Sequence, residues 1–280
     1  MTDAPTITAT LVARHEEGVI ERCLSSLRDV VDEIIVIHDG PCEDRTLEIA
    51  ERMGARTAEL PLVGHAERHT VTAYEWATGE WIFSIDADEF LSEELRRELR
   101  ALVAREDVNG YEFLWRMWDG SRYITERGPH KLSLFRRSAL HVSGLIHSVE
   151  QIDPPVVRSD LHLEHRPLYN NWTLPNMWGK WRRWARIHAE ELLMPLEDLP
   201  AYNVPVKPRW TWRRKVLNAL SPVLVLPYFV GTFVITLRRG REVYSLREGL
   251  RFALYSAIYS TMVQVYVAKM LYIDRLRRAR

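Results

Sequence analysis

The strongest constraint on the fold is that four short apolar runs alternate with segments of helical period in the first 90 residues. The runs have the length and the β-branched content of buried strands. We expect strands at 6–13, 33–37, 56–60 and 80–85, with helices at 18–28, 44–53 and 66–78. Strands and helices in this order predict an α/β fold, in which a parallel sheet carries helices on both faces.

In parallel sheets of this kind, ligands bind in the crevice at the carboxyl ends of the strands. The residues that directly follow the predicted strands are therefore the candidates for a functional site. They form three polar segments, Arg14-His15-Glu16, His38-Asp39-Gly40 and Asp86-Ala87-Asp88-Glu89. The third segment has three acids in four residues, so it says most about the chemistry.

Beyond residue 90 the pattern extends the sheet and then changes character. We expect a charged amphipathic helix at 92–105, strands at 109–118, 131–135 and 156–163, and a long helix rich in Trp and Arg at 170–194. Four prolines between 195 and 208 indicate a linker. The sequence thus predicts one domain over 1–200 and a second region over 205–280.

The net charge of zero conceals two parts of opposite sign. Residues 205–280 hold 15 Lys or Arg and 3 Asp or Glu, whereas residues 1–204 hold 23 and 35. The acidic part suits a metal and its substrate, and the basic part suits the phosphates of lipid headgroups or nucleic acid. The two cysteines, Cys23 and Cys42, have no metal-ligand or disulfide spacing, so a reduced cytosolic setting is the default.

The acids Asp86, Asp88 and Glu89 predict a cation site, because carboxylates this close repel one another unless a cation or water separates them. Mg²⁺ and Mn²⁺ prefer oxygen ligands and are often held by one or two carboxylates together with substrate phosphates. Such a cation would neutralise a departing nucleoside diphosphate. The alternative is a solvated acidic loop that precedes the helix at 92–105.

Three segments together resemble a known family. They are 8–23 (TATLVARHEEGVIERC), 31–50 (VDEIIVIHDGPCEDRTLEIA) and 78–91 (TGEWIFSIDADEFL). In this order and spacing they resemble family 2 glycosyltransferases, especially bacterial lipopolysaccharide-core and related membrane-associated glycan transferases, over most of the first 165 residues. The resemblance implies a GT-A fold, which is a Rossmann-like, mixed and mainly parallel sheet flanked by helices. It also implies an inverting, hexosyltransferase-like enzyme that uses a UDP-sugar and Mg²⁺ or Mn²⁺.

The resemblance assigns roles to residues of the acidic segment. Asp86 and Asp88 resemble the family's DxD pair, which binds the divalent metal and the sugar-nucleotide, with Ala87 between them. Asp88 is thereby also a catalytic candidate. Glu89 matches the acid that often follows the pair, and we expect it on the acceptor side.

Other donor contacts are implied by the earlier loops. Asp39 resembles the acid that contacts the nucleoside, and Arg68 resembles the basic residue near the diphosphate. The loop after the first strand is expected to line the base and ribose; its residues are Leu11, Val12, Arg14, His15 and Glu16. The sequence departs from the family where His15 replaces a frequent Asn and where 38–43 replaces a Ser/Thr-rich turn.

Transfer to an acceptor hydroxyl needs a general base within hydrogen-bond reach of that hydroxyl. The candidates are His130, His147, Glu150, His162, Glu164 and His165. The segment 144–150 (GLIHSVE) resembles the family's glycine–histidine–acid segment, so we predict Glu150 as the base and His147 as a metal ligand or acceptor contact. His130 is a further acceptor-side candidate. The alternative for His147, and for His162 and His165, is a structural role at a strand edge.

Two apolar stretches in the basic region, 216–237 and 252–273, are each close to the ~20 residues that cross a bilayer. Prolines interrupt the first, polar residues interrupt the second, and five arginines lie between 238 and 251. We therefore predict helices that lie in or re-enter an anionic membrane surface through 205–280. The alternative is a helical hairpin packed on the catalytic domain or on a partner subunit. Nucleic acid is not expected, because the arginines flank long apolar runs.

The sequence therefore predicts an enzyme at the cytoplasmic face of the cell membrane, bound in a peripheral or monotopic manner. Its partners would be a nucleotide-sugar donor, a lipid-linked or membrane-proximal glycan acceptor, the membrane surface and, as a further candidate, a second copy of the chain. One rival is a polyprenyl-phosphate sugar synthase, whose acceptor is the lipid phosphate itself. The other is a non-catalytic membrane scaffold that keeps the fold.

Overall fold

The computed structural model describes residues 4–125, 128–170, 173–195, 198, 201–202 and 216–274. It divides the chain into two compact units. The first, called the sheet unit, comprises Met1–Asn171 and Pro200–Val204. The second, called the helical unit, comprises Trp172–Leu199 and Pro205–Arg280. The division differs from the sequence-based boundary, because the helix after residue 173 belongs to the helical unit.

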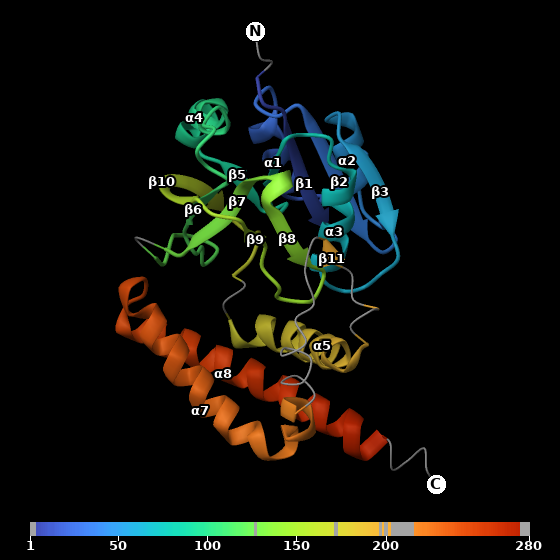
Figure 1. Ribbon diagram of the computed structural model, residues 1–280, viewed down its shortest axis with the longest axis vertical. Coiled ribbons are helices and arrows are strands. Elements are labelled where there is room, and N and C mark those ends of the chain that lie inside the picture. The colour runs from blue at the N-terminus through green and yellow to red at the C-terminus, as the bar shows by residue number, and fades with distance from the viewer. Residues whose placement is uncertain are drawn as a thin grey trace. The chain divides into compact units, whose positions relative to one another are not determined.

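The first half of the sheet unit confirms the predicted alternation of strands and helices (Figure 1). The elements are β1 (Ile7–Ala13), α1 (Ile20–Leu27), β2 (Glu33–Asp39), α2 (Thr46–Arg52), β3 (Arg56–Leu60), α3 (Glu67–Trp76) and β4 (Trp81–Ser84). The four strands are parallel and lie in the order β3-β2-β1-β4. All four carboxyl ends therefore meet at one edge, where ligands are expected.

The second half makes the sheet mixed. Its elements are β5 (Glu89–Leu91), α4 (Glu93–Val103), β6 (Gly110–Trp115), β7 (His130–Arg136) and β10 (Val156–His165). The sheet continues from β4 as β7-β6-β10-β5, with β7 antiparallel to both of its neighbours. A three-stranded sheet joins β11 (Ala201–Tyr202), β8 (Leu140–Ser143) and β9 (Gln151–Ile152), and a 3₁₀ turn, η1 (Arg137–Ala139), precedes β8.

Both faces of β1, β2 and β4 are largely buried, which explains why these strands read as continuous apolar runs. The edge strand β3 is partly exposed. On β2, Val36 belongs to the core under α1, α2 and α4, whereas Ile35 and Ile37 belong to the core under α3. On β4, Phe83 and Ile82 divide between the two cores in the same way. Side chains of successive strand residues alternate between faces, so each run supplies both layers.

The helical unit contains α5 (Leu174–Leu193), α7 (Ser221–Arg239), η3 (Gly240–Glu242), α8 (Leu246–Ala268) and the π-helical η4 (Lys269–Asp274). Ala185 and Ala189 of α5 pack against Val263 and Val267 of α8, which explains why α5 groups with the C-terminal helices. Among the described residues, α7 is the one helix long and apolar enough to cross a bilayer by length and composition. The predicted linker at 195–208 lies largely outside the described residues.

Candidate active site

The acidic segment begins directly after β4, at the carboxyl edge of the sheet. The Asp86 side chain is 57% exposed, that of Asp88 is 23% exposed, and that of Glu89 is buried. Ala87 is buried between them. Glu89 opens β5, a short strand that pairs with the end of β10. The sharp return from β4 into β5 therefore leaves the two aspartates at the surface and turns Glu89 inward.

Lys131 of β7 neutralises part of this acidic segment. Its Nζ lies 2.7 Å from Asp86 Oδ2, and 2.7 and 2.8 Å from the two carboxylate oxygens of Glu89. Glu89 also accepts hydrogen bonds from Trp115 Nε1 at 2.6 Å and from the Asp86 backbone N–H at 2.8 Å. Glu89 is thus an internal support of the segment, and its predicted contact with the acceptor stays a prediction.

The titration behaviour of the segment follows from burial and from this ammonium group. Desolvation raises the pKa of Glu89 to about 7, although the Lys131 charge opposes the rise. Desolvation also raises the pKa of Asp86, but the charge and hydrogen bond of Lys131 outweigh it and hold that pKa below its usual range. Asp86 therefore stays ionised at neutral pH, as metal ligation requires.

Asp88 lies beside His165, one of the histidines that the sequence offered as a candidate base. His165 Nε2, at the end of β10, is 3.4 Å from Asp88 Oδ2, and the His165 ring lies 4.4 Å from that of Trp115. The Arg166 backbone N–H donates to the Asp88 carbonyl oxygen at 3.0 Å. The sequence left open whether His165 is a candidate base or a structural residue at a strand edge, and the pairing of β10 with β5 brings it to the acids.

Glu150, the predicted base, reaches the same edge. It accepts a hydrogen bond from the Tyr74 hydroxyl of α3 at 2.6 Å, and this hydroxyl is 2.9 Å from Ser84 Oγ. Ser84 ends β4, two residues before Asp86. The structure thus joins the segment at 144–150 to the strand that carries the acids, across 76 residues of sequence.

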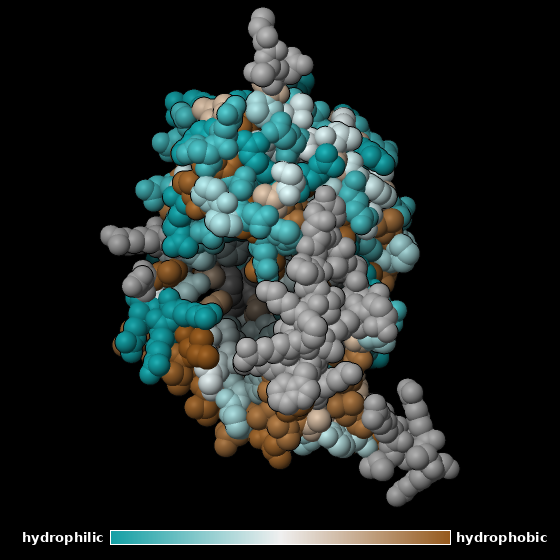
Figure 2. All heavy atoms as spheres, in the orientation of Figure 1, coloured by the Kyte–Doolittle hydropathy of each residue, from teal (hydrophilic) through white to brown (hydrophobic). Residues whose placement is uncertain are grey.

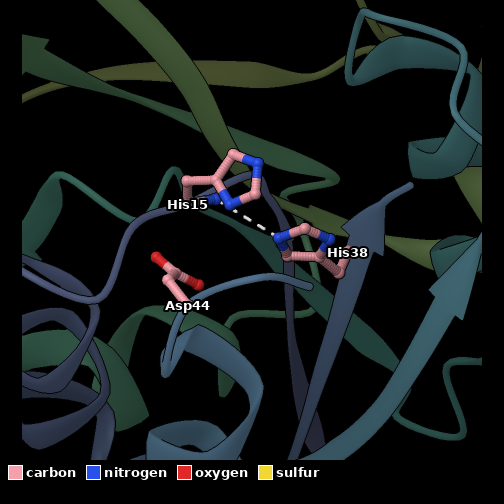
Figure 3. A group of neighbouring side chains, drawn as sticks. All are labelled: His15, His38 and Asp44. Carbon is pink, nitrogen blue, oxygen red and sulfur yellow. Dashed lines mark hydrogen bonds between the residues drawn. The ribbon is translucent and has the colours of Figure 1, made fainter. Parts of the chain in front are cut away.

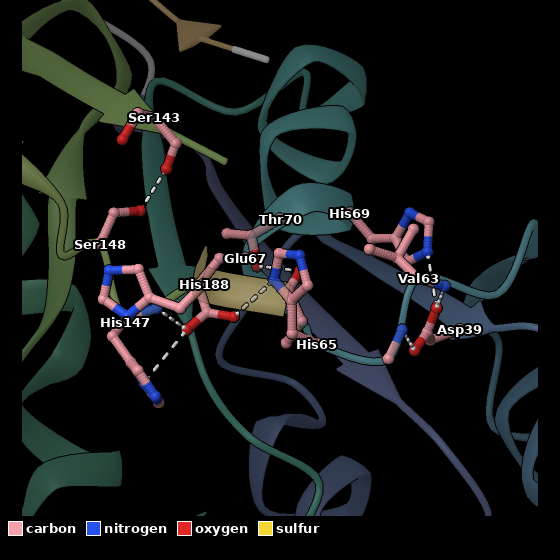
Figure 4. A network of polar contacts seen from close by, with 12 residues as sticks. Asp39, Val63, His65, Glu67, His69, Thr70, Ser143, His147, Ser148 and His188 are labelled. Carbon is pink, nitrogen blue, oxygen red and sulfur yellow. Dashed lines mark hydrogen bonds and ion pairs between the residues drawn. The ribbon is translucent and has the colours of Figure 1, made fainter. Parts of the chain in front are cut away.

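His147 and His130, the two histidines predicted on the acceptor side, lie in different parts of the fold: His147 in a turn and His130 on β7. His147 has a left-handed backbone with φ of 60°, and its backbone N–H donates to Glu67 Oε1 at 2.6 Å (Figure 4). Its ring Nδ1 is 3.9 Å from the same oxygen. His130 precedes Lys131 on β7 and so points to the opposite face of the sheet. Burial, with the nearby Arg158, lowers the pKa of His130.

Asp39, at the end of β2, organises the loop after β3. Its Oδ1 accepts from the Val63 N–H at 2.6 Å and lies 3.0 Å from His69 Nε2, and its Oδ2 accepts from the Gly64 N–H at 2.8 Å (Figure 4). Asp39 is buried, so the structure gives it a part in shaping this edge. Its predicted contact with the nucleoside stays a prediction, as does that of Arg68, in the first turn of α3.

The loop after β1 is tied to the end of β2 by a group of side chains shown in Figure 3. Ligand atoms of His15, His38 and Asp44 lie within 4.8 Å of one another, as in a metal site. However, His38 Nε2 accepts the His15 backbone N–H at 3.2 Å, and its Nδ1 lies 2.7 Å from the Gly40 carbonyl oxygen. We interpret the group as a set of hydrogen bonds that links the two loops.

The remaining predicted donor residues lie at the end of β1 and in the loop that follows it. The Glu16 backbone N–H donates to Thr46 Oγ1 at 2.8 Å, and Arg14 is exposed. Val12 is half-buried, whereas the Leu11 side chain lies in the core. A donor contact from Leu11 would therefore have to come from its backbone.

Comparison with known proteins agrees with the sequence motifs. The model of the glycosyl transferase family 2 matches residues 8–150, about half of the chain. An uncharacterized glycosyltransferase of Rickettsia bellii is 34% identical over 105 residues, which are 38% of this chain and 35% of that protein. The SPbeta prophage-derived glycosyltransferase SunS of Bacillus subtilis is 33% identical over 114 residues, 37% of this chain and 24% of that protein. The chain thus spans about a third or less of the length of these relatives.

Solved structures with a related arrangement include glucosyl-3-phosphoglycerate synthase from Mycobacterium tuberculosis, crystallised with Mn²⁺, uridine diphosphate and phosphoglyceric acid. It has a TM-score of 0.46 and 18% identity over 72% of this chain and 88% of that one. Residues 1–349 of TarS from S. aureus give a TM-score of 0.46 and 13% identity over 96% and 92%. On the family match and the motifs in it, the chain belongs to glycosyl transferase family 2.

Proposed function

We propose that this glycosyltransferase moves a sugar from a UDP-sugar, with Mg²⁺ or Mn²⁺ and with inversion, to a lipid-linked or membrane-proximal glycan. The observation that carries the proposal is the meeting of two groups at the end of β4. Asp86 and Asp88 follow β4 there. Glu150 is linked through the Tyr74 hydroxyl to Ser84, which lies two residues before Asp86. An acid pair for a donor and a carboxylate base for an acceptor are the two components that direct displacement needs.

The residues present fit a divalent cation. Asp86 and Asp88 offer carboxylate oxygens that reach the surface, and the His165 imidazole adjoins Asp88. Carboxylates suit Mg²⁺ and Mn²⁺. Lys131 balances only part of the negative charge, so a further cation is electrostatically favourable. When bound, the cation would neutralise charge on the departing diphosphate.

The donor and the metal can be tested together. Purified protein is screened against nucleotide sugars with Mg²⁺, Mn²⁺ or chelator, scored by the melting temperature and by release of nucleoside diphosphate. We expect stabilisation by a UDP-sugar only when the metal is present, because the diphosphate bridges to it. Asp88→Asn should remove the effect of the metal, whereas Glu75→Gln, on the exposed side of α3, should not. Stabilisation of equal size in chelator would contradict the proposed metal.

The base is tested by Glu150→Gln, which keeps the shape of the side chain but cannot take a proton. We expect transfer to fall by at least about 100-fold, within the range of general-base contributions, while the donor Kd stays within about twofold. Retained turnover would place the base elsewhere. The anomeric configuration of the transferred sugar in the product, compared with that in the donor, distinguishes inversion from retention.

The proposed acceptor and location rest on the helical unit. Side chains of α7 remain exposed, with Val223 at 70% and Leu226 at 69%, and apolar atoms gather over this unit in Figure 2. The arginines at 238, 239, 241, 247 and 251 suit anionic headgroups. We propose a peripheral or monotopic attachment to the cytoplasmic face of the cell membrane. Offering a lipid-linked glycan and a polyprenyl phosphate in parallel separates the proposed transferase from a polyprenyl-phosphate sugar synthase.

A further inference from the structure

We propose that α3 is the template that positions the acceptor loop, defined as residues 144–150, and that Glu67 and Tyr74 are its positioning residues. The inference rests on the proposed function, because it concerns how the candidate base Glu150 is held. It adds two residues that no sequence motif indicated.

Glu67 fixes the middle of the acceptor loop. Its Oε1 accepts the His147 backbone N–H at 2.6 Å, and its Oε2 lies 3.0 Å from Nδ1 of the buried His65 (Figure 4). His147 has φ of 60°, a conformation that residues other than glycine rarely adopt without compensating contacts. Glu67 therefore stabilises the turn at His147 by accepting this backbone N–H.

Tyr74 fixes the end of the acceptor loop. The phenol is fully buried, and its ring packs edge-on against Phe135 with the centroids 5.6 Å apart. Burial raises the pKa of Tyr74 well above its usual range, so its oxygen keeps the proton. With one hydrogen to give, the phenol donates to the Glu150 carboxylate and accepts from the Ser84 hydroxyl. The carboxylate is thus aimed by a rigid donor on a packed helix.

The spacing of the two anchors is within reach of their targets. Glu67 and Tyr74 are seven residues apart on α3, so they lie on one face about 10.5 Å apart along the helix axis. His147 and Glu150 are three residues apart, a stretch of chain that can span up to about 10 Å. Two attachments fix the orientation of a loop as well as its position. The helix that flanks β4 thereby holds the base in register with the acids that follow β4.

The test compares Tyr74→Phe, which removes only the hydroxyl, with Glu67→Ala and Glu67→Gln. We expect Tyr74→Phe and Glu67→Ala to lower kcat by about 10- to 100-fold through misplacement of the base, with the donor Kd within about twofold. Glu67→Gln keeps an oxygen for the His147 N–H and should recover most of the loss. Glu75→Gln, one residue from Tyr74 and exposed, is the matched control.

Amide hydrogen exchange supplies a readout that does not depend on turnover. Exchange within 144–150 should accelerate in Glu67→Ala, while that of β4 stays unchanged. If kcat and loop exchange in both variants match wild type while Glu150→Gln is inactive, the positioning role is refuted and the proposed function stands. If Glu150→Gln is active while Glu67→Ala still loosens the loop, α3 positions the loop and the base has to be sought elsewhere in the site.

Discussion

At the scale of single residues, the charge of Lys131 offsets the negative charge of the acidic segment and thereby stabilises the fold. Glu89 is fully buried and bonds to Lys131 Nζ through both carboxylate oxygens. Without Lys131, the buried Glu89 either stays charged and uncompensated, which typically costs 3–5 kcal/mol, or takes up a proton at a smaller cost. Lys131→Met should therefore lower the free energy of unfolding by up to about 3 kcal/mol, measured by urea denaturation at neutral pH.

The second variant of this cycle shows whether charge is the cause. Lys131→Met combined with Glu89→Gln removes both members of the pair, so it should recover part of the stability lost in Lys131→Met alone. Both proteins lose the same lysine packing, which cancels in the comparison. Equal instability of the single and double variants would show that packing of the lysine stem, and not charge, is what matters.

Gly79 illustrates a different residue-scale constraint, that of close backbone approach. A Cβ at this position would lie 2.6 Å from the Thr8 backbone nitrogen and 2.9 Å from the Trp81 carbonyl oxygen. Neither atom can move without disturbing the pairing of β1 with β4. We expect Gly79→Ala to lower the free energy of unfolding by about 2–3 kcal/mol.

Gly179 provides the control for Gly79, because it lies inside α5 with no atom within 4 Å of an added Cβ. There, Gly179→Ala should be neutral or stabilising by up to about 1 kcal/mol through helix propensity. Chemical denaturation of the two variants side by side distinguishes them. A stable Gly79→Ala protein would mean that β1 and β4 are not packed as closely as described.

At the scale of elements, the link between β2 and the loop after β3 depends on one carboxylate. Desolvation raises the pKa of Asp39, but hydrogen bonds from His69, Val63 and Gly64 outweigh it and hold that pKa below its usual range. A folded-state pKa below the unfolded value of about 3.9 stabilises the fold above that pH. This stability is lost as the pH falls through the lower, folded-state pKa.

The corresponding variant is Asp39→Asn, which should cost about 1–3 kcal/mol of unfolding free energy near neutral pH through lost hydrogen bonds. The difference from wild type should stay level at neutral pH and shrink as the pH falls below about 4 toward the lower folded-state pKa, where the folded wild-type carboxylate also becomes protonated. Urea denaturation at a series of pH values measures it. A difference that does not depend on pH would show that the carboxylate charge contributes nothing to this link.

Some elements of the fold could be predicted from the sequence and others could not. The parallel strands and their end loops were predictable, because buried strands form continuous apolar runs and their ends are polar. The three-residue β5 was not, since its first residue is the acid Glu89 and its pairing with β10 is distant in sequence. Lys131, Glu67 and Tyr74 could not be identified from the sequence for a related reason, and neither could the contact of His165 with Asp88. A periodic pattern gives the face on which a side chain lies, but not the loop or strand that lies opposite.

At the scale of the whole molecule, the uneven charge along the sequence coincides with two units of different surface. The sheet unit presents mainly hydrophilic atoms in Figure 2, whereas α7 exposes a run of aliphatic side chains. Only 6% of the apolar window of α7 is buried. Exposed apolar area of this kind indicates a binding surface, and the neighbouring arginines favour an anionic one. The proposed catalytic site and the proposed membrane attachment thus belong to different units of the chain.

This attachment predicts that charge on α7 weakens membrane binding without unfolding the protein. In Leu226→Glu and Val230→Glu the new carboxylate replaces a side chain that is at least half exposed, so the melting temperature should hardly change. Co-sedimentation with vesicles that contain anionic lipid should fall at least about tenfold, because each acid loses apolar burial and meets like charge. Val156→Glu, on β10 of the sheet unit, is the matched control and should bind like wild type. If the two α7 variants sediment as wild type does, the exposed face of α7 is not the attachment surface, and a partner protein or a second copy becomes the better explanation for it.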